Sequence, residues 1–298
     1  MFPDKCSGCP VENQFLFYYG TYSSENSHTG TSFSDFFFSL VSKKFSVREH
    51  LKFFMEMELK ELFGWSFDDV DARKVGIDSS GHRKFLNNFY TGKYPGSFAR
   101  GVPFQFNADN DDVRISGTFS SLAGLEEAVE KGDNELIEKA VRRINMLRAI
   151  QVSIGGIPLV YGGDEFGQIN DYTYLTDPTK INDSRWVHRA KRRWEARDDL
   201  ADQDTLEWRF FREMVKLFRL RKEIPAFQNG GVEVISTGNP HLLGYIRAFE
   251  NQRILVINNF SDKPQKMDTG RLEIYGARGG CRQPIERRGR FPRRRPYG

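Results

Sequence analysis

The segment from residue 134 to residue 165 constrains the fold of this chain more than any other. Between residues 134 and 150, apolar side chains recur at spacings of three and four, which predicts an amphipathic helix. The run 153 to 161 is apolar and ends at Gly162-Gly163-Asp164-Glu165, a pattern that favours a buried parallel strand. A helix followed by a buried strand is the repeating unit of α/β folds, so we predict the α/β fold class.

The C-terminal third changes its periodicity. Asp204 and Glu207 have the spacing of a capping box, which predicts a helix over 205 to 222. After residue 231 apolar and polar side chains alternate in two runs separated by a short polar turn. We therefore expect an antiparallel β-module appended to the α/β body.

The positive charge is concentrated in a C-terminal tail. The formal net charge is +4, whereas residues 276 to 298 contain eight Arg against one acidic residue and so carry +7, which leaves −3 on the rest. The body of the chain therefore presents no large positive field, and we expect no nucleic-acid partner. We expect the tail to be disordered because Arg, Gly and Pro dominate it; the alternative is an arginine-rich segment that binds phosphates.

Several other protein classes are disfavoured. Cys6, Cys9 and Cys281 have the spacing neither of a disulfide framework nor of a four-ligand zinc site, so we expect no metal and no other cofactor. No stretch reaches the roughly 18 apolar residues of a membrane span. Residues 1 to 10 lack the features of a signal peptide, which favours the cytoplasm but leaves the compartment and the oligomeric state open.

Ordered sequence motifs carry a family resemblance over about Gly64 to Phe260. They are Gly64-Trp65-Ser66-Phe67, His82-Arg83-Lys84-Phe85-Leu86-Asn87, the run from Gly96 to Gln105, Arg114-x-Ser116-Gly117-Thr118, the run from Gly155 to Glu165, and Asp183-Ser184-Arg185-Trp186. In order and approximate spacing they resemble amylosucrase, a sucrose-using transglucosylase family of the α-amylase superfamily.

The resemblance implies a partial TIM (β/α)8 barrel. It places about strands seven and eight and their helices in residues 64 to 230, followed by a truncated C-terminal antiparallel β-domain over 231 to 275. Residues 1 to 63 do not match the family, and 276 to 298 form the tail. The abrupt changes at Gly64 and near Arg271 lead us to expect a truncated or frameshifted reading frame that retains the C-terminal half.

The resemblance also implies which catalytic groups to look for. Retaining enzymes of this kind need a nucleophile and an acid/base roughly 5 Å apart, both carboxyl groups. In the family these follow strands four and five, which should precede residue 48, and no segment there matches them. Glu61 falls at the position of a third carboxylate, with Lys60 in place of the family's histidine. The helical spacing around Glu61 equally supports an exposed helix charge.

Four residues match sugar-binding positions of the family. Arg185 corresponds to an arginine of the glucosyl subsite, and Arg83, Gln105 and Arg114 correspond to the acceptor side. Each has a structural alternative: Arg185 anchors its loop to Asp183 or Asp171, and the other arginines are surface residues. We expect His188 to be a packing residue, Asp164 and Glu165 to cap the loop, and Phe104, Phe106 and Tyr161 to belong to the core.

The resemblance therefore predicts an amylosucrase-like glucosyltransferase or glycoside hydrolase that converts sucrose to α-glucan and fructose. Its expected partners are sucrose and an α-glucan or oligosaccharide. Because the catalytic pair is missing, we expect this chain alone to be inactive. The alternatives are an inactive barrel fragment with residual sugar binding, or a related superfamily enzyme such as a trehalose synthase or an oligoglucosidase.

Overall fold

A computed structural model describes residues 10–11, 15–21, 69–74, 76–107, 112–191 and 204–267. Glu61, most of the segment 1–63 and the arginine-rich tail lie outside these residues. Within them, no helix is long and apolar enough to cross a membrane. The same part of the chain contains no group of three or more His, Cys, Asp or Glu side chains arranged to hold a metal ion.

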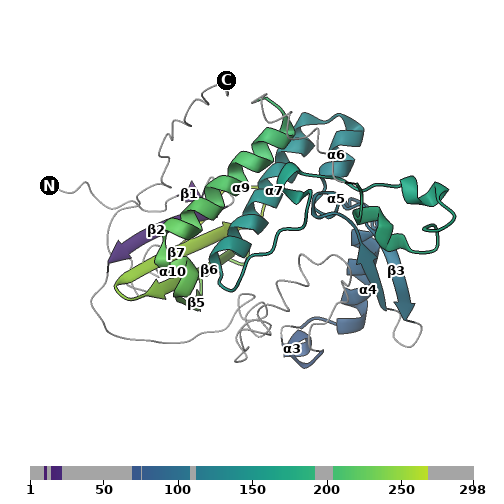
Figure 1. The fold of residues 1–298 in the computed structure, drawn as a ribbon. Coiled ribbons are helices and arrows are strands. Elements are labelled where there is room, and N and C mark those ends of the chain that lie inside the picture. Colours follow the sequence, from purple (N-terminus) through teal and green to yellow (C-terminus); the bar gives the residue numbers. More distant parts are fainter. Residues whose placement is uncertain are drawn as a thin grey trace, which may run out of the picture.

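The C-terminal module is a four-stranded antiparallel sheet with the order β2-β7-β6-β5 (Figure 1). The strands are β5 (Gly231–Ile235), β6 (Leu242–Phe249), β7 (Gln252–Asn259) and β2 (Phe15–Thr21). The predicted antiparallel module is thus confirmed. Its edge strand β2 comes from the N-terminal segment, where no sustained period predicted a strand. A separate short pair joins β1 (Pro10–Val11), which precedes β2 in the chain, to β8 (Gln265–Lys266), which follows β7.

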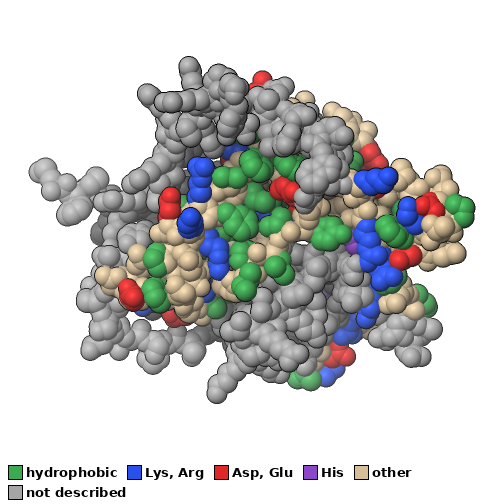
Figure 2. Space-filling view, viewed as in Figure 1, with side chains coloured by type: hydrophobic (Ala, Val, Ile, Leu, Met, Phe, Trp, Pro, Cys, Tyr) green, Lys and Arg blue, Asp and Glu red, His purple; other side chains and the backbone are tan. Residues whose placement is uncertain are grey.

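Two long helices connect this sheet to the rest of the molecule. They are α7 (Asn134–Ser153), capped by the Asp133 side chain, and α9 (Leu206–Glu223). The predicted capping box of Asp204 and Glu207 is wrong: the N-cap is Thr205, whose side chain accepts the hydrogen bond from the Trp208 amide. Figure 2 shows hydrophobic side chains gathered over α9 and α7.

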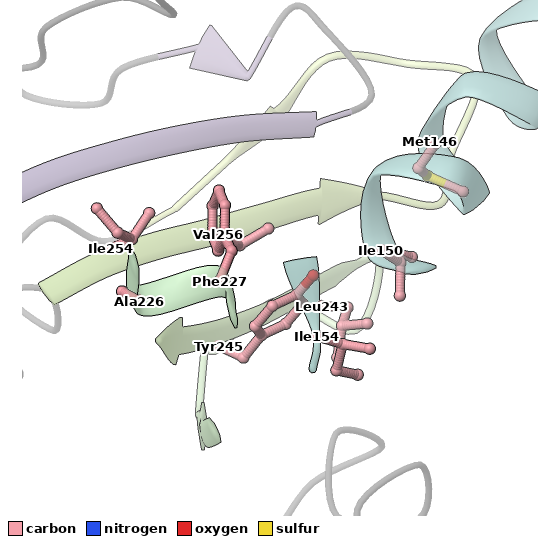
Figure 3. Packing of buried hydrophobic residues seen from close by; sticks show 9 residues of the cluster. All are labelled: Met146, Ile150, Ile154, Ala226, Phe227, Leu243, Tyr245, Ile254 and Val256. Carbon is pink, nitrogen blue, oxygen red and sulfur yellow. The ribbon is translucent and has the colours of Figure 1, made fainter. Parts of the chain in front are cut away.

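The main core lies where the end of α7 and the short helix α10 (Pro225–Asn229) meet the sheet (Figure 3). Tyr245 is fully buried there, and its hydroxyl lies 2.6 Å from Ser153 Oγ at the end of α7. The buried members of this core are Met146, Ile150, Ile154, Ala226, Phe227, Leu243, Tyr245, Ile254 and Val256. One face of the sheet therefore shares an apolar layer with the helices, and the other face packs in a second cluster around Ile246 and Leu255.

Two arginines bind the carbonyl groups at the C-terminal end of α7. Arg247 Nη1 donates to Ile154 O (2.8 Å), and Arg221 donates to Val152 O (2.6 Å) and Gly156 O (2.5 Å). Burial lowers the pKa of Arg247 to about 10. Within the described residues neither arginine pairs with a carboxylate, so their charges are compensated by helix-terminal carbonyls, which carry the negative end of the helix dipole.

The predicted parallel strand over 153–161 is wrong. Ser153 is the last residue of α7, and residues 154–161 form no strand. A parallel strand needs hydrogen-bonded neighbours, and every strand pair in the described part of the chain is antiparallel. The structure is a mixture of helices and antiparallel sheets, and the described residues form no barrel.

The remaining elements lie at the opposite end of the molecule from the sheet (Figure 1). Their helices are α3 (Asp69–Lys74), α4 (Ser79–Tyr90), α5 (Phe119–Leu122) and α6 (Leu125–Lys131). A hairpin of β3 (Val102–Asn107) and β4 (Asp112–Ser116) packs against α4. Three 3-10 turns complete this part, η1 (Asp164–Phe166), η2 (Thr173–Thr176) and η3 (Ser184–His188).

Candidate functional site

The β3–β4 hairpin carries the predicted acceptor-side residues and is interrupted by a β-bulge. Phe104 pairs with Arg114 and Phe106 pairs with Val113, so Gln105 is an extra residue without a partner on β4. Gln105 has a φ of 53°, in the left-handed region that is costly for a side chain with a Cβ. Such outliers persist only where the surrounding structure holds them, and they are frequent at functional sites.

The bulge moves Phe106 to the opposite face of the hairpin from Phe104. Without the extra residue both rings would lie on one face, because side chains alternate along a strand. The prediction that Phe106 belongs to the core is wrong, since 64% of it is exposed. Phe104 is half-buried under the η3 turn. The sequence alternation alone gave no sign of this change of face.

A pair of substitutions tests the backbone conformation of Gln105. Because both remove its side-chain hydrogen bond, Gln105→Gly and Gln105→Val differ mainly in tolerance of a positive φ. We expect the Gly variant to be more stable by about 1–2 kcal/mol in urea unfolding. The control is the same two substitutions at Glu233 on β5. There we expect Glu233→Val to be more stable than Glu233→Gly, because β-branched residues favour strands. Equal stability of the two variants at 105 would contradict the bulge geometry.

Arg185 is held at the start of η3 by a bidentate ion pair. Its Nε and Nη2 donate to the two carboxylate oxygens of Asp183 at 2.8 and 2.9 Å. The hydrogen bond from Arg185 lowers the pKa of Asp183. The guanidinium lies over the Phe104 ring, 4.8 Å from its centroid, and Ser184 Oγ donates to Pro103 O (2.8 Å). The contact between Arg185 and Asp183, which the structural alternative for Arg185 predicted, is therefore confirmed.

Three of the four predicted sugar-binding residues lie together. Arg114 Nη1 donates to Gln105 Oε1 (2.9 Å), and Arg114 pairs across the hairpin with the Phe104 that Arg185 covers. Arg83 lies apart on α4, where its guanidinium donates to Asp69 on α3. The hairpin and η3 thus form one polar face around Phe104.

The Ser116-Gly117-Thr118 motif has a structural role behind this face. The Thr118 amide donates to Asn170 Oδ1 (2.7 Å), and the Thr118 side chain caps α5 by accepting from the Ser121 amide. The Asn170 amide donates in turn to Ser121 Oγ (2.9 Å). These buried bonds join the end of β4 to the loop that leads to η2 and η3. These bonds thereby hold the loop before η2 and η3 against the end of β4.

The other residues noted in the sequence are structural. His188 is buried and its ring contacts the edge of Tyr161 at 6.0 Å between centroids, which agrees with a packing role. Asp164 forms a buried ion pair with Arg148, with Nη2 and Oδ2 2.8 Å apart. Glu165 Oε2 accepts from the Gly163 amide (2.6 Å), which caps the loop as expected.

The carboxyl groups near the polar face do not form a catalytic pair. Hydrogen bonds from Lys180 and Thr179 lower the pKa of Asp177 to about 2, and Asp183 is paired with Arg185. Both are therefore ionised at neutral pH, whereas glycoside chemistry needs one protonated acid beside one ionised group. Burial raises the pKa of Glu126, but its Oε1 accepts from Tyr172 Oη (2.8 Å) in the interior. The described part of this face can bind but has no acid/base pair.

Comparison with known proteins gives limited similarity. No family model matches the chain. The trehalulose synthase MutB from Pseudomonas mesoacidophila MX-45 aligns with 17% identity and a TM-score of 0.29. A MutB mutant in complex with glucose aligns at 16% identity, and another in complex with the substrate sucrose at 18%, both with TM-scores of 0.30. Each alignment covers 41% of this chain and 30% of the MutB chain. This chain thus matches less than a third of the length of those proteins.

Proposed function

We propose that this chain is the sugar-binding part of an amylosucrase-like glucosyltransferase or glycoside hydrolase, in which the acceptor or glucosyl unit lies on the face formed by β3, β4 and η3. The observation that carries the proposal is the grouping of Gln105, Arg114 and Arg185 around Phe104. The amylosucrase-like motifs of the sequence assign these same positions to sugar contacts. The substrate proposed is sucrose, with an α-glucan or oligosaccharide as acceptor.

The chemistry of the face suits a sugar ring. Vicinal hydroxyls are bound best by planar groups that present hydrogen-bonding atoms in pairs, as guanidinium and amide groups do. Asp183 fixes Arg185 through Nε and Nη2, which leaves Nη1 without a described protein partner. Arg114 uses Nη1 for Gln105 and likewise retains unpaired N–H groups within the described residues. Both side chains are half-buried, so they are oriented but reachable.

A second candidate function is sugar binding without turnover. It is favoured by the low pKa values of Asp177 and Asp183, which remove both as general acids. Glu61, at the position of the third carboxylate, lies outside the described residues. Trehalose synthase and oligoglucosidase activities remain as alternatives within the same superfamily. The two candidates differ in whether sucrose is consumed, which an assay of the whole chain decides.

The test combines sugar binding with sucrose turnover. We expect Arg185→Ala to weaken sucrose or maltoheptaose binding by roughly tenfold or more in saturation-transfer NMR titrations, as for a lost charged hydrogen-bond donor. Asp183→Asn keeps the guanidinium and should cost only a few-fold. Arg212→Ala, on exposed α9 surface, should bind as the parent does.

Turnover is followed in the same samples as release of glucose, fructose and glucan. We expect none from the parent, and Glu61→Gln to change nothing. Turnover that disappears in Arg185→Ala would show that residues before Gly64 supply the nucleophile. Unchanged sugar binding in a folded Arg185→Ala variant would contradict the proposed site.

A further inference from the structure

The carboxyl group of Glu126 is buried without a positive charge paired to it. Glu126 lies in the first turn of α6, and only 3% of it is exposed. Its Oε1 accepts a hydrogen bond from Tyr172 Oη (2.8 Å), whereas Oε2 is buried and has no hydrogen-bond partner in the described part of the chain. No Lys, Arg or His among the described residues forms an ion pair with it. A buried carboxyl in such surroundings favours its protonated form.

The charged groups around Glu126 do not compensate a negative charge on it. Glu130, one turn further along α6, is a like charge that acts on Glu126. Arg100 forms ion pairs with Glu127 and Glu130, and Lys131 forms one with Glu127. The charged side chains on the other elements around this site are Arg143 of α7, which donates to Ala123 O, and Asp171, Lys191 and Glu207, which line a cavity of about 410 Å³ that Tyr172 also lines. Burial, with the charge of Glu130 adding to it, raises the pKa of Glu126 above its ordinary value and outweighs the hydrogen bonds that the carboxyl accepts.

Tyr172 connects this carboxyl to the segment that holds η3. The Tyr172 hydroxyl also accepts from Asn170 Nδ2 (3.2 Å), and Asn170 makes the buried bonds to the end of β4 and to α5. The amide of Asp171, between these two residues, donates to Val187 O in η3 (2.8 Å). The segment 170–172, which we call the junction, is therefore bound by Glu126 on one side and binds η3 on the other.

We propose that Glu126 is a pH-sensitive switch for this junction. The carboxyl group is protonated while the junction is closed. Its ionisation at higher pH favours an open form, in which Tyr172 moves aside and water reaches the carboxylate. Opening weakens the hold of the junction on η3, so the polar face is best ordered at mildly acidic pH. An effect on sugar binding rests on the proposed function, whereas the switch itself does not.

The direction of the switch follows from proton binding. Because closure raises the pKa of Glu126, the closed junction binds the proton more tightly than an open form with a hydrated carboxyl. Closure therefore has its full stability below the ordinary pKa of a glutamate, about 4.3, and loses it as the pH rises through the raised pKa. Asp183, whose pKa the hydrogen bond from Arg185 lowers, gives the opposite slope.

Hydrogen exchange at the junction amides tests the switch on the whole chain. The amides of Thr118 and Asp171 report closure, because they donate to Asn170 Oδ1 and Val187 O. The amide of Val256, in the central strand β7, reports unfolding of the sheet. Protection is measured from pH 5 to 8 and corrected for the pH dependence of intrinsic amide exchange.

The variants separate Glu126 from its neighbours on α6. Glu126→Gln keeps an acceptor for the Tyr172 hydroxyl but cannot ionise, and Glu127→Gln changes the adjacent glutamate as the matched control. Glu130→Gln removes the like charge and should lower the pKa of Glu126, so the loss of protection should end at a lower pH. This third variant keeps the test decisive if Glu126→Gln does not fold.

In the parent we expect protection of both junction amides to fall by up to about tenfold per pH unit until the raised pKa is passed, as for the release of one proton. Glu126→Gln should show no such fall, and Glu127→Gln should show the same fall as the parent. The Val256 amide should remain more strongly protected at every pH, because the junction opens while the sheet stays folded. Protection that does not depend on pH in the parent, a fall that persists in Glu126→Gln, or junction amides protected as strongly as Val256 would overturn the proposal.

Sucrose titrations of the same samples keep the switch distinct from the proposed function. Sucrose should bind the parent more weakly at pH 8 than at pH 5, and should bind Glu126→Gln equally at both. The expected exchange pattern without sucrose binding at either pH would support the switch and contradict the proposed sugar site.

Discussion

Asp164→Ala is expected to lower the free energy of unfolding by about 3–5 kcal/mol, because it leaves the Arg148 charge buried without its carboxylate. The two side chains are only 4% and 2% exposed, and Nη2 lies 2.8 Å from Oδ2. Arg148 is also oriented by a bond to Gln151 Oε1 (2.9 Å) and lies 4.4 Å from the centroid of the Phe119 ring. It has little freedom to turn toward water. Urea unfolding followed by circular dichroism measures the loss.

A double replacement separates the ion pair from simple packing. Arg148→Met with Asp164→Leu removes both charges, and we expect it to recover most of the stability lost in Asp164→Ala, since replacing a whole buried pair is often neutral. Glu135→Ala, which breaks an exposed pair with Lys139 on α7, should cost less than about 0.5 kcal/mol. A loss in Asp164→Ala as small as this exposed control would show that water reaches Arg148.

Arg247→Met should lower the free energy of unfolding by about 2–4 kcal/mol. The substitution preserves the apolar stem but removes charge-assisted hydrogen bonds to Ile154 O (2.8 Å) and Ala226 O (3.1 Å), each worth about 1.5–3 kcal/mol. Of the two carbonyls left behind, Ile154 O lies at the negative end of the α7 dipole, and Ala226 O belongs to α10. The substitution also removes the cost of burying the charged guanidinium, which offsets part of this loss. The measurement is again the urea midpoint and slope.

Two further variants make the result specific. Arg247→Lys keeps the charge but has a single point donor, so we expect about half of the loss. Arg212→Met, on a side chain that is 47% exposed, should change stability by less than about 0.5 kcal/mol. If Arg247→Met matched Arg212→Met, the end of α7 would not depend on the arginines, and another contact would have to join the helices to the sheet.

The helices and the C-terminal strands could be predicted because their signals are local. Spacings of three and four mark α7 and α9, since one face of each helix packs on a core. Alternation predicted β6 and β7, although both faces of these two strands are buried, in separate clusters. The resemblance predicted that Gln105 and Arg114 lie on the same side of the site, and they are in contact, but it also placed Arg83 with them and Arg185 in a different subsite. The distribution of charge placed the excess of Arg in the tail.

The larger failures concern non-local partners. The run 153–161 has the composition of a buried strand, but hydrogen-bonded neighbours decide whether a strand forms, and composition does not contain them. The face occupied by Phe106 depends on one extra residue in a hairpin register. The ion pair of Arg185 with Asp183, and its position over Phe104, required both the η3 turn and the hairpin to be placed.

Sequence by itself thus determined the two long helices, the antiparallel module and the candidate residues of the polar face, because periodicity and motifs are properties of neighbouring positions. Tertiary structure alone decided that β2 joins the sheet, that Arg221 and Arg247 bind the end of α7, and that Arg83 stays with Asp69. Each of these depends on groups that lie far apart in the chain and meet only after the core has packed. The physical reason is that pairing energies are set by distance and burial, and both are fixed by the fold.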